Sequence, residues 1–282
     1  MRFTKMEGLG NDFIVVTEED LSPYLAHISS LARKLCDRHF GIGADGIVVV
    51  TPSERAEVGM RIWNADGSEA EMCGNGIRCL AKFVFERGMV KGEEFTVETK
   101  AGIMVPRVIV EAGRVREVVV NMGKPRLAPP EIPVRVTGDR ALRVPLALGE
   151  RIISFTAVSM GNPHAVIFEI PPDWVELGEE IENHPLFPER VNVEFVKVEH
   201  PRRAVVKAWE RGAGATLACG TGACAVLVAG VLNGVLEREA EICLPGGVLH
   251  IRWSPEGYVI MRGEVKEIFT GEIQDEVMTR WM

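Results

Sequence analysis

Two cysteines, Cys73 and Cys219, occupy matching positions in two similar segments of this chain. Each lies ten positions after a tryptophan, Trp63 or Trp209, and each opens a Cys-Gly-x-Gly sequence followed by an apolar run. A cysteine just before such a run is expected at a helix N-terminus, where unpaired N–H groups and the helix dipole favour negative charge. We therefore expect both thiols to have pKa values lowered from about 8.5 towards neutrality. The same N–H groups could hold a carboxylate.

The similarity between the two segments extends beyond the cysteines. Each apolar run ends at a glycine fifteen positions after its cysteine, Gly88 and Gly234. A Gly-Asn pair also recurs, at Asn11 and Asn162, 151 residues apart, close to the 146 that separate the cysteines. These matches indicate an internal duplication, which is the first feature to look for in a sequence.

Two thiol loops related by duplication are expected to face each other between the halves. A carboxylate held by both helix N-termini would then have one thiol on each side of its α-carbon. One thiolate would remove the α-proton and the opposite thiol would return a proton to the other face, inverting the centre. The helix N-termini would stabilise the developing charge without a metal or an imine-forming cofactor, so we expect no cofactor.

The elements that must position these thiols follow from hydrophobic patterning. Residues 75–87 and 221–233 are largely apolar and end at glycine, which is typical of a buried helix. A surface helix is expected near 29–39. The proline-rich stretch 124–150 is interpreted as the crossover between the halves. Strands are expected at 13–16, 46–50, 118–122, 165–170, 204–209, 248–253 and 259–263.

The predicted fold is α+β, with two pseudo-symmetric domains. Each is a curved mixed or antiparallel sheet wrapped around one central apolar helix. The expected domains are 1–125, joined by the last strand at 266–282, and 126–265.

Composition agrees with such a protein. The chain has 282 residues, of which 46% are hydrophobic and 26% charged, which excludes fibrous, disordered and small disulfide-rich classes. The net charge of −8 disfavours nucleic acid as a partner. The N-terminus has no signal-peptide core, and the longest apolar run, 223–232, is too short to cross a membrane. We expect a cytoplasmic protein whose partner is a small molecule, with no membrane association.

Other motifs carry weaker signals. The spacings Cys73-x5-Cys79 and Cys219-x4-Cys224 do not fit a zinc knuckle, and no local His pair accompanies them, so no metal is predicted. Cys79, Cys224, Cys36 and Cys243 are interpreted as structural. The GIGADG sequence at 41–46 matches a dinucleotide-binding string, but it follows a helix and precedes a strand, the reverse of the required context.

Polar residues in Gly/Pro-rich turns accompany the two thiol loops. They are Asn11, Asn64, Asn162, Asn192, His164, Glu210 and Arg211. Glu210 and Arg211 precede Cys219 by nine and eight residues, in a loop expected to reach the same cleft. The Arg211 guanidinium is suited to a second, distal carboxylate.

Six sequence blocks resemble those of the diaminopimelate epimerase family. They are GLGNDF at 8–13, NADGSEAEMCGNGIRC at 64–79, VSMGNPHAV at 158–166, PERVNVEF at 188–195, WERGAGATLACGTGACA at 209–225 and LPGG at 244–247. They occur in family order over nearly the whole chain. The resemblance implies a cofactor-independent isomerase that interconverts L,L- and meso-diaminopimelate in lysine and peptidoglycan-precursor biosynthesis, commonly as a homodimer.

The resemblance also implies roles for individual residues. Cys73 and Cys219 would be the catalytic acid/base thiols, with His164 and Glu210 beside them influencing their proton affinity. The reacting carboxylate would be held by Gly74, Asn75, Gly220 and Thr221. The rest of the substrate would be bound by Asn11, Asn64, Asn162, Asn192, Glu210 and Arg211.

Two positions depart from the family pattern. Many members have His where this chain has Glu7, and some have a substrate-contacting Gln where it has Gly46. Glu7 is interpreted as peripheral, and Gly46 is left out of the expected site. The sequence does not determine which thiol deprotonates which stereoisomer.

Two alternatives remain open at the level of sequence. One is a two-thiol proline or hydroxyproline racemase of the same architecture, although Arg211 and the asparagines favour a longer, doubly zwitterionic substrate. The other is a dithiol metal-binding or redox-sensing protein.

Overall fold

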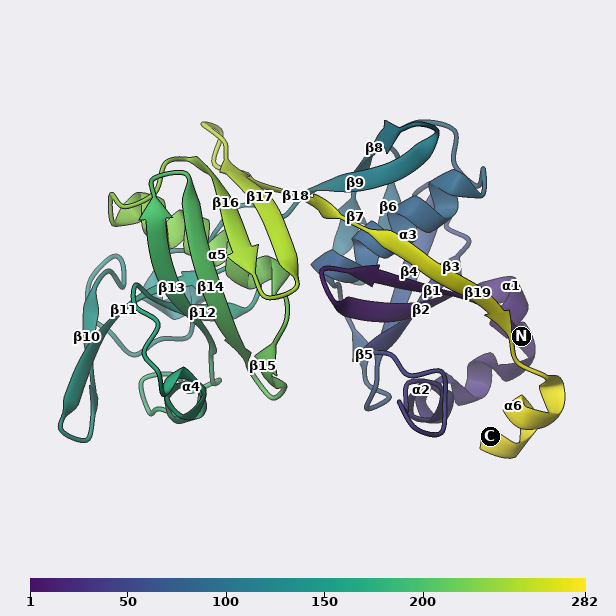
Figure 1. The fold of residues 1–282 in the computed structure, drawn as a ribbon, viewed down its shortest axis with the longest axis horizontal. Coiled ribbons are helices and arrows are strands. Elements are labelled where there is room, and N and C mark those ends of the chain that lie inside the picture. Colours follow the sequence, from purple (N-terminus) through teal and green to yellow (C-terminus); the bar gives the residue numbers. More distant parts are fainter. The chain divides into compact units, whose positions relative to one another are not determined.

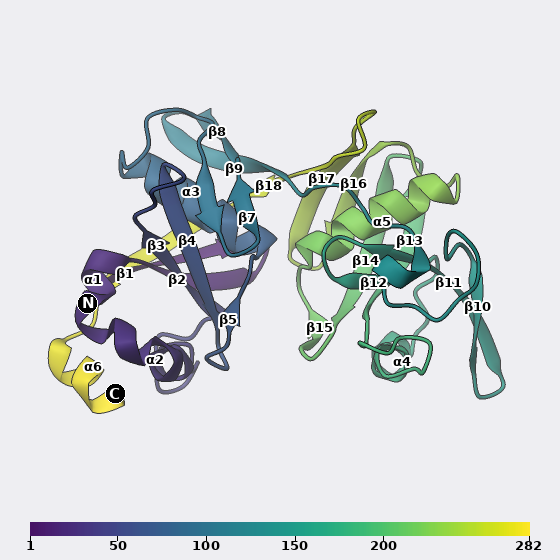
Figure 2. The ribbon, with the colours of Figure 1, turned by 180° about the vertical axis from the view of Figure 1, so that it is seen from behind.

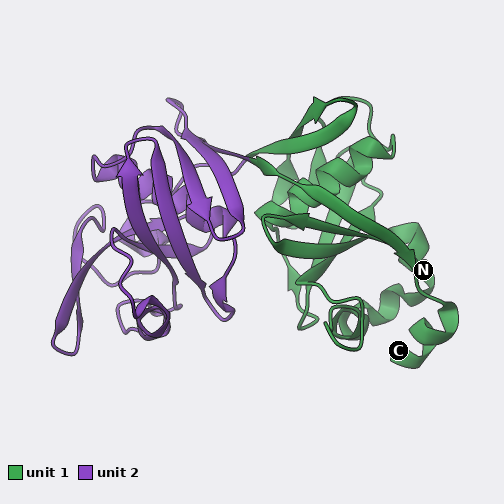
Figure 3. Cartoon of the chain, in the orientation of Figure 1, with its two compact units in different colours: residues 1–120, 263–282 green, residues 121–262 purple.

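Two 13-residue helices, α3 (Gly74–Glu86) and α5 (Gly220–Leu232), correspond to the two predicted apolar segments. They belong to different compact units of the computed structural model, which describes residues 1–282. Unit 1 comprises residues 1–120 and 263–282, and unit 2 comprises residues 121–262 (Figure 3). The sequence-based domain limits lie at 125/126 and 265/266.

Both helices begin and end in the same way. Cys73 and Cys219 are the N-caps, and each sulfur accepts a backbone N–H from the residue three positions on, Gly76 or Gly222, at 3.4 and 3.3 Å. After each helix comes a glycine at positive φ, 68° at Gly88 and 71° at Gly234, which lets the chain reverse.

Unit 1 is built on one mixed sheet whose strand order is β19-β1-β2-β3-β4-β6-β7, with β5 paired to β4 (Figure 1). The strand bounds are β1 Arg2–Gly8, β2 Asn11–Thr17, β3 Gly46–Thr51, β4 Val58–Asn64, β5 Glu69–Ala70, β6 Val97–Thr99, β7 Gly102–Met104 and β19 Lys266–Glu272. Strands β2 and β3 are parallel, as are β4 and β6. A further hairpin, β8 (Arg107–Glu111) with β9 (Arg114–Asn121), packs on α3 through β8.

Both faces of the unit 1 sheet are covered. Val48 and Ile62 point towards Gly76 of α3, whereas Ile47, Val49 and Trp63 point into a second core on the opposite face. The second core is closed by the helices α1 (Glu18–Leu21), η1 (Ser22–His27), α2 (Ile28–Leu35) and α6 (Asp275–Trp281). The central strands are buried on both faces, which is why they read as continuous apolar runs.

Unit 2 repeats this plan around α5. Its strand order is β10-β11-β12-β13-β14-β16-β17-β18, with β15 paired to β14. The bounds are β10 Val144–Leu148, β11 Arg151–Ser159, β12 Pro163–Ile167, β13 Asn192–His200, β14 Arg203–Glu210, β15 Gly214–Thr216, β16 Glu239–Leu244, β17 Gly247–Trp253 and β18 Val259–Glu264, whose last two residues fall in unit 1. Figure 2 shows α5 lying across these strands.

The second face of the unit 2 sheet carries α4 (Trp174–Glu182) and a short 3₁₀ turn, η2 (Pro129–Glu131). Alternation along β13 assigns its side chains to the two faces. Val193 and Phe195 enter the core beneath α4, while Glu194 lies beside Gly222 of α5.

The architecture confirms the predicted α+β fold, with one apolar helix on a curved sheet in each unit. All seven predicted strands are present, and the surface helix expected near 29–39 is α2. The expected crossover at 124–150 is wrong, because the whole stretch belongs to unit 2, where it forms η2 and β10. The chain passes between the units at 120/121 and again at 262/263. None of its helices has the length and apolar character needed to span a bilayer.

Gly178 of α4 sets how closely this helix approaches β14. A Cβ atom at residue 178 would lie 2.7 Å from Cγ of Trp209. We predict that Gly178→Ala lowers the free energy of unfolding by about 1–2 kcal/mol, because overpacking outweighs the better helix propensity of alanine. Chemical denaturation measures the change. Glu179→Ala, on the exposed side of the same helix, is the control and should change stability by less than about 0.5 kcal/mol. A stabilised Gly178→Ala variant would contradict this packing argument.

Candidate active site

Asn11 is placed beside the Cys73 loop by a tight hairpin. Strands β1 and β2 are joined by Leu9 and Gly10, both at positive φ (59° and 83°), the conformation of a type I′ turn. Asn11 is the first residue of β2. Its Oδ1 accepts a hydrogen bond from Nδ2 of Asn75 at 3.0 Å and lies 3.9 Å from the Cys73 sulfur.

The Cys73 thiol is therefore surrounded by amides and backbone N–H groups. Cys73 is partly exposed, while Asn75, in the first turn of α3, is buried. Gly74 and Gly76 leave the first turn of the helix without side chains next to the sulfur. This end of α3 combines a thiol with anion-binding backbone groups.

Asn64 and Gly46 lie opposite each other at the paired ends of β4 and β3. Asn64 is exposed, and its Nδ2 donates to the Ser68 hydroxyl at 3.0 Å. A Cβ atom at residue 46 would lie 2.6 Å from the carbonyl oxygen of Trp63, so this backbone leaves no room for a side chain there. Glu7 accepts the backbone N–H of Gly10 at 2.9 Å and so supports the hairpin turn that carries Asn11.

In unit 2 the Cys219 thiol is buried, in contrast to Cys73. Its sulfur lies 3.5 Å from the Thr221 hydroxyl and accepts the N–H of Gly222. Two carboxyl groups, Glu210 and Glu194, are close enough to act on it electrostatically.

The expected lowering of the Cys219 pKa is wrong. Burial raises the pKa of this thiol well above its usual value, and the charges of Glu210 and Glu194 raise it further. The Gly222 N–H and the Thr221 hydroxyl act in the opposite direction but are weaker. A helix N-terminus favours a thiolate, but desolvation by burial disfavours any charge and here outweighs the hydrogen bonds to the sulfur. Burial similarly raises the pKa of Cys36 to about 12.

Glu210 couples to the Cys219 thiol directly. Its Oε1 accepts a hydrogen bond from the Thr216 hydroxyl at 2.6 Å, and its carboxyl group is hydrogen-bonded to Cys219. Burial raises the pKa of Glu210, so this carboxyl group holds a proton more readily than an exposed glutamate would.

His164 lies between Asn162 and a buried glutamate that the sequence analysis did not identify. Nδ1 is 2.7 Å from Oε1 of Glu194, and Nε2 is 2.9 Å from Oδ1 of Asn162. His164 and Glu194 are fully buried. The signal for Glu194 is a charged residue within the apolar strand VNVEFV, on the face that α5 covers.

Asn192, Arg211 and Glu182 organise the loop that follows β14. Asn192 donates to the Pro163 carbonyl at 2.8 Å and accepts the N–H of Arg211 at 2.9 Å. Glu182, at the end of α4, accepts hydrogen bonds from the Trp209 indole (2.8 Å) and the Gly212 N–H (2.9 Å). Glu182 is not among the predicted site residues, and only its place late in an amphipathic helix could have marked it.

One set of residues has the composition of a metal site. The ligand atoms of His164, Glu194 and Cys219 lie within 4.8 Å of one another. Both nitrogens of His164 are already engaged, by Glu194 and Asn162, so neither offers a free lone pair. These three residues fit a hydrogen-bonded acid/base cluster better than a metal centre.

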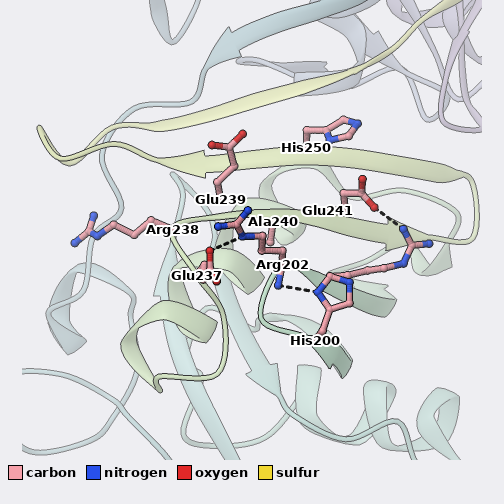
Figure 4. A pocket seen from close by; sticks show the side chains of 9 residues that line it. His200, Arg202, Glu237, Arg238, Glu239, Ala240, Glu241 and His250 are labelled. Atoms are coloured by element: carbon pink, nitrogen blue, oxygen red, sulfur yellow. Dashed lines mark hydrogen bonds and ion pairs between the residues drawn. The ribbon is translucent and has the colours of Figure 1, made fainter.

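A hollow of about 630 Å³ lies elsewhere on unit 2, along β13, β14, β16 and β17 (Figure 4). It is lined by charged residues that pair with one another, Arg202 with Glu237 and Arg203 with Glu241. None of the residues expected to act in catalysis lines it.

The predicted residues thus form one group in each unit. In unit 1 the group contains Asn11, Cys73, Gly74 and Asn75, with Asn64 at the neighbouring strand end. In unit 2 it contains Asn162, His164, Asn192, Glu210, Arg211, Cys219, Gly220 and Thr221.

Comparison with solved structures defines the class of fold. The chain resembles a probable proline racemase from Agrobacterium radiobacter K84 (TM-score 0.70, 17% identity, covering 97% of this chain and 92% of that one). It also resembles a PhzF-family phenazine biosynthesis protein from Bacillus anthracis (TM-score 0.68, 15% identity, covering 97% and 99%). This is a racemase/epimerase type of fold.

Sequence comparison identifies the family. Residues 3–128 and 156–268 match the family model described as diaminopimelate epimerase. The diaminopimelate epimerase of Pelotomaculum thermopropionicum is 54% identical over 278 residues, covering 96% of this chain and 98% of that protein. The chain belongs to the diaminopimelate epimerase family, and the protein is an isomerase that acts on amino acids.

The two carboxyl groups near Cys219 lead to a test by chemical modification. Replacing Glu210 with glutamine removes a negative charge beside the sulfur and should lower the pKa of Cys219, although burial still holds it high. Alkylation by iodoacetamide, followed by mass spectrometry of the Cys219 peptide across pH, should show a midpoint lower than in the wild type. At a fixed pH below both midpoints, each pH unit of this shift corresponds to about tenfold faster alkylation.

Glu239→Gln is the matched control, because Glu239 is exposed on β16 and lines the hollow described above. It should leave the Cys219 midpoint unchanged. Equal midpoints in Glu210→Gln and the wild type would show that the Glu210 charge does not act on the thiol.

Proposed function

We propose that this protein interconverts L,L- and meso-diaminopimelate by proton transfer between two thiols, without a cofactor. The observation that carries the proposal is the helix cap that occurs in both units: a cysteine is the N-cap of the buried helix of each unit, and its sulfur accepts a backbone N–H there. The substrate assignment rests on family membership. The alternative substrates, proline and hydroxyproline, belong to proteins that share the fold.

In the proposed reaction one cysteine thiolate takes the α-proton and becomes a thiol. The electron pair left on the α-carbon is delocalised into the carboxylate, which the N–H groups of both helix ends stabilise. The other cysteine gives its proton to the opposite face and becomes the thiolate. No atom is gained or lost, and the two sulfurs exchange protonation states.

The side chains around the thiols support distinct roles. Gly74, Asn75, Gly220 and Thr221 are proposed to hold the reacting carboxylate. The rest of the substrate is proposed to be bound by Asn11, Asn64, Asn162, Asn192, Glu210 and Arg211. His164 and Glu210 are proposed to set the proton affinity of the thiols, and the hydrogen bond between Glu210 and Cys219 supports this for one of them.

We further propose that the enzyme works in the cytoplasm, as a homodimer, in lysine and peptidoglycan-precursor synthesis. All six cysteines are free thiols, which agrees with a reducing compartment. The pathway follows from the proposed substrate.

The proposal is tested by exchange of the α-proton of L,L-diaminopimelate in deuterated water. The wild type should exchange the proton and form the meso isomer. Cys73→Ala and Cys219→Ala should each lower the rate of complete epimerisation by at least about 100-fold, because each lacks one of two positioned acid/base groups.

Cys243→Ala is the control, since Cys243 lies within β16 and caps neither helix, and it should retain full activity. Full activity in either single variant of the two capping cysteines would overturn the two-base mechanism. Labelling of proline but not of diaminopimelate by the wild type would overturn the substrate assignment.

A further inference from the structure

Asp45 has no part in the mechanism above, yet three hydrogen-bond donors converge on it. It is the residue before β3, in the GIGADG sequence that the dinucleotide interpretation could not explain. Oδ2 accepts Nδ2 of Asn11 at 2.6 Å and the backbone N–H of Asp12 at 3.0 Å. Oδ1 accepts Nη2 of Arg38 at 2.8 Å.

The Asp45 carboxylate is itself held in a compact network of charges. Arg38 also forms a bidentate pair with Asp12, at 2.7 and 3.2 Å, and Lys5 pairs with Asp12. Arg38 and Lys5 hold the pKa of Asp12 at about 2, against the effect of burial. Two cations, Arg38 and Lys5, and a second carboxylate, Asp12, thus hold the Asp45 carboxylate in a network of charges.

This network decides which way the Asn11 amide points. A carboxylate oxygen only accepts hydrogen bonds, so the group facing Asp45 must be the NH₂ of Asn11. The amide oxygen is then directed the other way, towards Nδ2 of Asn75 and the Cys73 sulfur. With the amide turned over, Asn11 would present NH₂ to Asn75 Nδ2, placing two donors against each other.

We propose that Asp45 is a positioning residue that fixes the Asn11 amide with its oxygen towards the Cys73 thiol. An acceptor beside Cys73 stabilises the thiol over the thiolate and orients its proton. The effect of Asp45 on turnover rests on the proposed function, whereas its effect on Cys73 chemistry does not. The experiment below therefore measures both turnover and the alkylation of Cys73.

Asp45→Asn is the variant that tests the proposal. An asparagine at 45 has only one acceptor oxygen. Arg38 competes for it with Asn11 and the Asp12 N–H, and the charged Arg38 competes best. Its NH₂ then faces Asn11 and turns the Asn11 amide, so that a donor replaces the acceptor beside Cys73. We expect kcat/KM to fall by about tenfold, and alkylation of Cys73 in a Cys219→Ala background to become several-fold faster at neutral pH.

A double-variant cycle with Asn11→Ala separates positioning from general loosening. If Asp45 acts through Asn11, Asp45→Asn should change neither rate further once Asn11 is alanine. Asp37→Asn is the matched control, because Asp37 lies in the same loop and caps the backbone N–H groups of His39 and Phe40 without touching Asn11.

The outcomes are distinguishable. Additive effects in the cycle, or equal acceleration of Cys73 alkylation by Asp37→Asn, would overturn the proposal. Absence of diaminopimelate turnover in the wild type would overturn the proposed function alone, and the alkylation cycle would still test Asp45. Measuring the unfolding midpoint of each variant excludes loss of the fold as the cause.

Discussion

The site depends on one local interaction made twice, the hydrogen bond from a backbone N–H to the sulfur of an N-capping cysteine. Serine, threonine, aspartate or asparagine would cap a helix better, because a neutral thiol is a weak acceptor. A cysteine cap therefore stabilises the helix less than one of these residues would, and the surrounding sheets compensate by burying α3 and α5 almost completely. The units can therefore keep reactive groups at their helix ends because tertiary packing, and not the cap, holds the helices in place.

The two caps are chemically unequal although the sequence repeats them. Cys73 is partly exposed and lies among amides, with Asn11 and Asn75 nearest. Cys219 is buried beside Glu210 and Glu194, and desolvation outweighs the hydrogen bonds that Thr221 and Gly222 make to the sulfur. The two helix ends thus share a backbone arrangement, whereas the side chains around their sulfurs differ. An enzyme that inverts a stereocentre meets two different substrates, and unequal thiols suit that requirement.

The sequence predicted best what depends on periodicity and spacing. The two apolar helices, the seven strands and the thiol at each helix start follow from local pattern, and the structure has them. Asp45, Glu182 and Glu194 could not be found in that way, because their importance lies in contacts with residues 27–34 positions distant, such as Asn11, Trp209 and His164. The prediction that the pKa of Cys219 is lowered was wrong for the same reason, since burial is a property of packing and not of a motif. Of the second layer of helices on unit 1, only α2 was predicted, because both faces of a fully apolar strand look alike in sequence.

Strand β19 has a consequence for how the chain is made. It pairs with β1 from Arg2 to Glu7, and the N-terminal amine donates to the Ile273 carbonyl at 2.8 Å. Unit 1 therefore cannot complete its sheet until β19 has been synthesised, whereas unit 2 is one continuous segment. All strands of unit 2 up to residue 262 are synthesised before β19, so unit 2 can complete its sheet before unit 1 does. Until β19 is available, β1 is an unpaired edge strand of unit 1, and an exposed edge can pair with another chain.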